Sequence, residues 1–276
     1  MKKLLALVLS LLVCSFLFAD VLTDAGITVQ DLEEVITHYK TLAEAGDAEA
    51  YETEFKFLKA AAELGSSQAM IYLGELYQGG FIEDAKIVED PIATAFYWWN
   101  LAARNGQSRA WSNMGLVYEH KAVPGGGSAY GSIPYNPSMA YYYYKLGCDE
   151  GDTKSARYVA LCYQNGVGVP QSYEKAREYF KLAVDRQSAY SYYAEYLLKG
   201  IGGEQDVDGA LALYQKVVDE NGHDAISCAL VLGDIYKDGV YVEKDAEKAA
   251  GYYELVIAKS PGSKDADRAR AALAEL

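Results

Sequence analysis

The sequence CALVLGDIYKDGVYVEKDAEKAAGYY, residues 228–253, has two helix-forming halves separated by a Gly-containing turn. In the first half Gly233 stands three residues before Tyr236, and in the second half Ala249 stands three residues before Tyr252. A tiny residue midway along a helix lets a neighbouring backbone approach, and an aromatic ring one turn away fills the adjoining space. The stretch therefore predicts one antiparallel pair of closely packed helices.

The same two halves occur at four further places upstream. In the first halves, the tiny residue and its partner are Gly74 and Tyr77, Gly115 and Tyr118, Ala160 and Tyr163, and Ala194 and Leu197. In the second halves, an alanine precedes a bulky pair: Ala95 before Trp98-Trp99, Ala140 before Tyr143-Tyr144, Ala176 before Tyr179-Phe180, and Ala210 before Leu213-Tyr214. One such pair of helices cannot bury its apolar stripe alone. The sequence thus predicts an all-α solenoid of five helix-turn-helix repeats, numbered one to five along the chain.

Helix boundaries are indicated by capping residues. The second helix of each repeat is expected to begin after a side chain that can accept a hydrogen bond from the first turn: Asp90, Asn136, Ser172, Asp206 and Asp245. Gly106, Gly151 and Gly222 are expected to end three of the second helices in the left-handed conformation. No glycine is present at the corresponding end in residues 186–188.

These residues resemble the Sel-one-like repeat (SLR) family, which is related to the tetratricopeptide repeats. Repeat three carries the resemblance clearly, with Gly166-Val167-Gly168, Lys175-Ala176 and Tyr179-Phe180 in the family order. The resemblance covers about residues 66–258. It implies a right-handed α/α superhelix whose inner groove is lined by the first helices, and it implies no particular ligand.

The two ends of the chain differ from the repeats. Residues 1–19 have two lysines, a short apolar run and a final alanine, which is typical of a secretory signal peptide. We therefore expect an exported protein, periplasmic or secreted, with a lipid anchor through Cys14 as the alternative and no transmembrane segment in the mature chain. Residues 28–65 are expected to form a degenerate opening helix pair, and residues 259–276 a C-terminal capping helix.

Composition excludes several functions. The net charge of −14 argues against nucleic acid as a partner, because an acidic chain repels phosphate backbones. The histidines are scattered, and neither a zinc spacing nor a phosphate-binding loop is present. We expect no catalytic residue, no metal site and no cofactor, and we expect a monomer.

One enzymatic alternative stays open. Ser172-Tyr173-Glu174-Lys175 matches the Ser-x-x-Lys pattern of penicillin-recognising enzymes, and some cysteine-rich SLR proteins have been described as β-lactamases. The alternative to a binding scaffold is therefore a hydrolase that acts on β-lactams or cell-wall material. Against it, Ser172 stands at a helix cap and Lys175 at the lysine that precedes the repeat alanine.

Two of the turns inside repeats are extended. From the tyrosine of the first helix (Leu197 in repeat four) to the alanine of the second, the distance is 13 residues in repeats three to five, but 18 in repeat one and 22 in repeat two. The longer insertion, residues 121–135, combines glycines with Tyr130 and Tyr135, a composition that suits an adaptable contact surface. A neutral insertion explains the same residues, because repeats tolerate longer loops at little cost.

If the first helices pack as in tetratricopeptide repeats, the groove positions lie six and three residues before the tiny residue and one and four residues after it. Three cations, Arg109, Lys154 and Arg157, then occupy neighbouring repeats. Together with Asn113 and Gln164 they form a candidate site for an acidic peptide segment. The alternative is that these cations pair with the surplus Asp and Glu of the chain itself. The predicted function is that of an exported scaffold that binds another protein or peptide through this groove and the two insertions.

Overall fold

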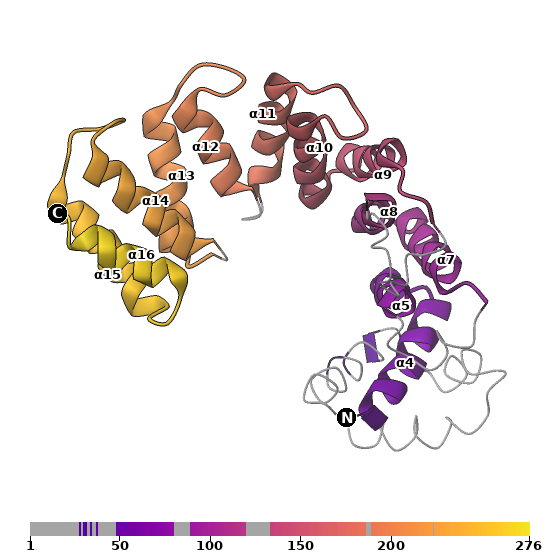
Figure 1. Ribbon diagram of the computed structural model, residues 1–276. Coiled ribbons are helices and arrows are strands. Elements are labelled where there is room, and N and C mark those ends of the chain that lie inside the picture. Colours follow the sequence, from indigo (N-terminus) through magenta and orange to yellow (C-terminus); the bar gives the residue numbers. More distant parts are fainter. Residues whose placement is uncertain are drawn as a thin grey trace. The chain divides into compact units, whose positions relative to one another are not determined.

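Figure 1 shows the computed structural model of the chain. It describes residues 48–79, 89–119, 133–185, 189–222 and 224–276, together with Thr28, Gln30, Asp31, Glu34 and Thr37. The described part of the chain is helical and contains no β-strand. Its helices are α4 (Ala48–Glu63), α5 (Ser67–Gly79), α7 (Pro91–Arg104), α8 (Arg109–Glu119), α9 (Pro137–Asp149), α10 (Thr153–Asn165), α11 (Tyr173–Leu182), α12 (Tyr190–Lys199), α13 (Val207–Asp219), α14 (Ala225–Asp238), α15 (Ala246–Lys259) and α16 (Lys264–Leu273).

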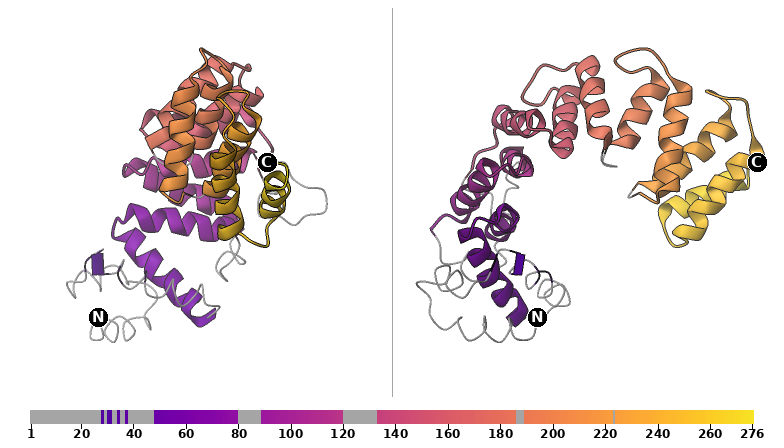
Figure 2. Two further views of the ribbon diagram at one scale, coloured as in Figure 1. Left: turned by 90° about the vertical axis from the view of Figure 1, so that its left-hand side faces the viewer. Right: turned by 180° about the vertical axis from the view of Figure 1, so that it is seen from behind.

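The chain forms two compact units, Met1–Gly147 and Cys148–Leu276, here called the N-terminal and C-terminal units. In the N-terminal unit α4 packs on α5, α5 on α7, and α7 on α8. In the C-terminal unit each helix from α10 to α16 likewise packs on the next, and α14, α15 and α16 lie side by side in all three views of Figures 1 and 2. This sequential packing confirms the predicted all-α solenoid of helix pairs.

The packing inside each pair follows the predicted fit of a tiny residue against an aromatic ring. A Cβ added at Gly74 would meet the Trp99 indole, one at Gly115 the Tyr144 ring, and one at Gly233 the Tyr253 ring. These three aromatic side chains are fully buried. In these three repeats, the second residue of the bulky pair therefore fills the space that the glycine of the preceding helix leaves open.

In repeats two, three and five, the first residue of the bulky pair stacks on the tyrosine of the first helix in the same repeat. Tyr143 stacks on Tyr118 with ring centroids 5.6 Å apart, Tyr179 on Tyr163 at 5.6 Å, and Tyr252 on Tyr236 at 6.0 Å. Many of the tyrosines are thus explained by packing between the two helices of one repeat rather than by binding.

The predicted N-caps are confirmed in all five repeats. Backbone N–H groups three residues further along donate to Asp90 (2.9 Å), Asn136 (3.1 Å), Ser172 (3.3 Å), Asp206 (2.8 Å) and Asp245 (2.9 Å). Ser263 caps α16 in the same way, at 3.1 Å. Each oxygen satisfies one of the N–H groups that the first helical turn leaves without a partner.

The predicted left-handed glycines are confirmed at Gly106 (φ 83°) and Gly151 (φ 88°). At the end of α13 the left-handed residue is Asn221 (φ 52°), one position before the predicted Gly222. The N–H of Gly222 instead donates to the Val217 carbonyl at 3.0 Å, and that of Asn221 to the Val218 carbonyl at 3.2 Å. Asparagine tolerates this conformation better than other residues with a Cβ, so the helix ends one residue early.

The ends of the chain are described in part. The first helix of the expected opening pair over 28–65 lies almost entirely outside the described residues, as do the expected signal peptide with Cys14 and all three histidines. No helix in the described segments has the length and apolar character needed to cross a membrane.

Candidate functional site

In repeats one, two, four and five, the first helix exposes a narrower stripe than the sequence indicated, because one predicted groove position is buried. At the position three residues before the tiny residue, Ile71, Ser112 and Leu230 are buried. Leu198, four residues after Ala194, is also buried. The other predicted groove positions that the structure describes, including Arg157 in repeat three, are partly or fully exposed.

In the N-terminal unit, Arg109 and Asn113 converge on one carboxylate. Both donate to Glu75 Oε1, Arg109 from Nη2 and Asn113 from Nδ2, each at 3.1 Å. Asn113 is buried, whereas the Arg109 and Glu75 side chains are partly exposed. The interaction joins the first helices of repeats one and two, so Arg109 makes the intramolecular ion pair that was the alternative to partner binding.

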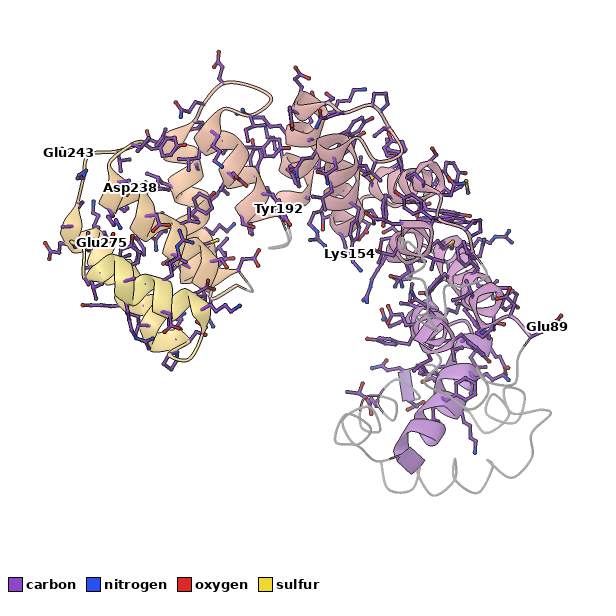
Figure 3. All side chains as sticks on the ribbon, viewed as in Figure 1. Glu89, Lys154, Tyr192, Asp238, Glu243 and Glu275 are labelled. Carbon is purple, nitrogen blue, oxygen red and sulfur yellow. The ribbon has the colours of Figure 1, made fainter. Side chains whose placement is uncertain are left out.

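In the C-terminal unit, Lys154 and Arg157 share the ring of Tyr158. The Lys154 ammonium lies 5.9 Å and the Arg157 guanidinium carbon 4.9 Å from the ring centroid. Figure 3 shows Lys154 extending away from α10. Arg157 Nε is buried and has no hydrogen-bond partner, and Arg157 forms no ion pair with the described residues. We call Lys154, Arg157 and Tyr158 the α10 cationic face.

Of the remaining candidate residues, Gln164 makes a structural contact and Tyr135 is exposed. Gln164 accepts a hydrogen bond from the Tyr196 hydroxyl at 2.9 Å, and this bond ties repeat three to repeat four. Tyr135 is exposed, two residues before the start of α9. Tyr130 and most of the 121–135 insertion lie outside the described residues, as does the shorter insertion of repeat one.

The structure also shows a pocket that sequence analysis missed. It lies between α12, α13 and α14 and has a volume of about 280 Å³. Tyr192, Leu198, Tyr214 and Val231 form apolar walls, and Glu195 and Ser227 are polar groups on its lining. The signal in the sequence was Glu195 directly after the tiny residue of repeat four, with the small Ser227 in the next first helix.

The residues of the Ser-x-x-Lys pattern are engaged in other contacts. Ser172 Oγ accepts from the Lys175 N–H and lies 3.0 Å from Glu174 Oε2. The Lys175 ammonium lies 5.1 Å from the centroid of the Tyr163 ring. The same lysine-on-tyrosine contact recurs in repeat five, where Lys248 lies 4.9 Å from the Tyr236 ring. Ser172 and Lys175 thus follow the geometry of the repeat.

Two of the three cysteines in the described chain are buried. Cys148, Cys162 and Cys228 form no disulfide among the described residues, and Cys162 and Cys228 are the buried ones. Burial raises the pKa of the Cys228 thiol to about 12, so the nucleophilic thiolate is scarce at neutral pH. The described residues contain no group of His, Cys, Asp and Glu arranged to hold a metal ion.

Stacked helix pairs with a ring packed against a glycine define an α-solenoid repeat protein. Five matches to the Sel1 repeat model, at residues 67–107, 126–152, 153–188, 187–220 and 226–258, span more than half of the chain. The chain therefore belongs to the Sel1 repeat family, a family of helical repeat scaffolds, as the resemblance to SLR proteins predicted.

Solved structures share this fold. One is the protective antigen c5321 of uropathogenic Escherichia coli, which has an SLR fold and 18% identity, with a TM-score of 0.68 over 94% of this chain. This chain spans only 52% of that protein. A Sel1 repeat protein from Oxalobacter formigenes is 22% identical, with a TM-score of 0.65 over 86% of this chain and 90% of its own. No curated protein matches significantly.

Proposed function

We propose that this protein is a scaffold that binds an extended segment of another polypeptide along its first helices, without chemistry of its own. The observation that carries the proposal is the α10 cationic face. Arg157 there forms no ion pair with the described residues, in a chain of net charge −14. A cation left unpaired among so many carboxylates is suited to an acidic partner.

The sequence also favours export. The leader-like residues 1–19 support a periplasmic or secreted scaffold, and the composition of the insertion at 121–135 suits a second contact surface. The intact mass of the protein from its native host tests the first point: a chain beginning at Asp20 is expected. A lipid-modified chain beginning at Cys14 would favour the anchored alternative.

The binding proposal is tested by capture with the immobilised chain, followed by cross-linking and mass spectrometry. The expected cross-links lie on first helices and include the α10 cationic face. Arg157→Glu is expected to reduce the amount of captured partner at least about tenfold, because a charge-assisted contact of about 1.5–3 kcal/mol is replaced by repulsion.

The matched control is Lys181→Glu. It makes the same change in net charge at an exposed residue of the second helix α11. Thermal unfolding of both variants shows whether each remains folded. Equal loss of capture in both folded variants, or cross-links confined to second helices, would contradict the proposal.

A further inference from the structure

Three first helices carry an acidic residue directly after the tiny residue: Glu75, Glu195 and Asp234. In two of the three, an arginine from a later helix of the same unit reaches that carboxylate. Arg109 of α8 donates to Glu75 at 3.1 Å, and Arg268 of α16 pairs with Asp234. The fold thus has a recurring position at which an acidic side chain receives a guanidinium.

Glu195 occupies the same position, but no arginine of the described residues reaches its carboxylate. In repeat five, Ser227 stands where repeat two has Arg109, and Val231 stands where it has Asn113. Ser227 is shorter than an arginine, and Val231 is apolar where repeat two has an amide. Both residues line the pocket of about 280 Å³ between α12, α13 and α14. The space that Arg109 and Asn113 fill between repeats one and two is therefore open between repeats four and five.

The Glu195 carboxylate has one hydrogen-bond donor in the described chain, Lys199 at 2.6 Å on the same helix. Both side chains of this pair are about half exposed, at 46% and 49%. Exposed pairs four residues apart on a helix contribute little stability, so Lys199 can yield to a donor with better geometry.

The pocket walls suit the rest of an arginine side chain. Tyr192 is held by stacking on Phe180, with centroids 5.2 Å apart, and Figure 3 shows Tyr192 near the start of α12. Tyr214 and Leu198 are buried beside it. Aromatic faces attract the planar guanidinium, and apolar walls accommodate the methylene stem that carries it.

We infer that this pocket binds an arginine side chain of a partner polypeptide, with the guanidinium on Glu195 and its stem between Tyr192 and Val231. The inference rests on the proposed scaffold function and specifies one side chain of the partner. Arg109 on Glu75 provides the internal example of the contact. A purely apolar side chain fits less well, because it would cover the Glu195 carboxylate without replacing its water.

The test uses N-acetyl-arginine amide as the probe and the full chain with labelled methyl groups. The methyl resonances of Leu198 and Val231 are expected to shift and saturate as the probe is added. N-acetyl-norleucine amide, with a side chain that has no charge, is expected to bind at least about tenfold more weakly, since hydrogen bonds to charged groups contribute most of the contact. Equal binding of the two probes would overturn the inference.

Three variants locate the contact. Glu195→Gln keeps the shape, removes the charge and is expected to weaken probe binding at least about tenfold. Ser227→Arg, at an exposed residue of α14, introduces an internal arginine at the position of Arg109 and is expected to block the probe. Lys199→Gln releases Glu195 and is expected to strengthen binding. Unchanged binding in folded Glu195→Gln would place the probe elsewhere and refute the assignment.

This experiment is independent of partner capture. If Arg157→Glu leaves capture unchanged while the probe still binds in a Glu195-dependent way, the scaffold proposal fails at α10 and the pocket assignment stands. If capture depends on Arg157 but the probe does not bind, the scaffold proposal stands and the pocket assignment fails.

Discussion

At the scale of single residues, the contact between a glycine and an aromatic ring sets the spacing of the two helices in a repeat. A Cβ at Gly233 would lie 2.6 Å from Tyr253 Cε1, far inside normal contact, and the Tyr253 ring is buried. The ring is also fixed at its far end, where its hydroxyl donates to Asp234 Oδ1 at 2.8 Å. The ring therefore has little freedom to move away from an added methyl group.

Gly233→Ala is expected to lower the free energy of unfolding by about 1–3 kcal/mol, and Gly233→Val by more, because each overpacks a fixed contact. Gly251→Ala is the matched control, since a Cβ at this exposed helical position of α15 meets nothing within 4 Å. The control is expected to be neutral or to stabilise by up to about 1 kcal/mol. Denaturant unfolding compares the two, and an equal response at both sites would mean that the glycine contact is not limiting.

At the scale of helices, the start of each repeat's second helix is set by a capping residue next to the first turn, so it can be predicted from the local sequence. Asp245 accepts the Lys248 N–H at 2.9 Å, and this backbone hydrogen bond is the main cause that lowers the pKa of the Asp245 carboxyl. A group whose pKa is lower in the folded state stabilises the fold above its unfolded pKa, and it loses that contribution as the pH falls through the folded pKa.

The stability difference between the wild type and Asp245→Asn should therefore depend on pH. At neutral pH the wild type is expected to be the more stable, because the ionised cap accepts a stronger hydrogen bond and faces the helix N-terminus. Below about pH 4 the difference should shrink, since the carboxyl becomes protonated and asparagine still caps. Chemical unfolding of both proteins between neutral and acidic pH measures this. A difference that grows on acidification would contradict the assigned cap.

The helices and their caps could be predicted from sequence because each depends on residues within one or two turns. Asn221 shows the limit of this reasoning, because Gly222 and Asn221 both tolerate the left-handed conformation and only the structure distinguishes them. The site was less predictable. Burial of Ile71 and the contact of Arg109 with Glu75 depend on how one repeat meets the next, 34 residues away in the latter case. The pocket beside Glu195 depends on the absence of such a contact.

At the scale of the whole molecule, the net charge of −14 and the α10 cationic face act in opposite directions on an acidic partner. The net charge repels the partner at long range, whereas Lys154 and Arg157 attract it on contact. Salt screens both the long-range repulsion and the local attraction, but it screens the interaction between distant charges more strongly. At about 0.15 M salt the screening length is about 8 Å, so the long-range repulsion is already largely suppressed.

Further addition of salt should therefore act mainly on the local attraction. Between about 0.15 M and about 0.6 M salt, the affinity for the captured partner is expected to fall steadily for the wild type. Arg157→Gln should bind more weakly at the lower salt concentration and should show a flatter dependence, because one attracting charge is gone while the helix and the Tyr158 ring remain. Fluorescence anisotropy of the labelled partner at several salt concentrations measures both slopes. An affinity that rises with salt over this range would mean that repulsion still governs the encounter, and that the α10 cationic face does not hold the partner.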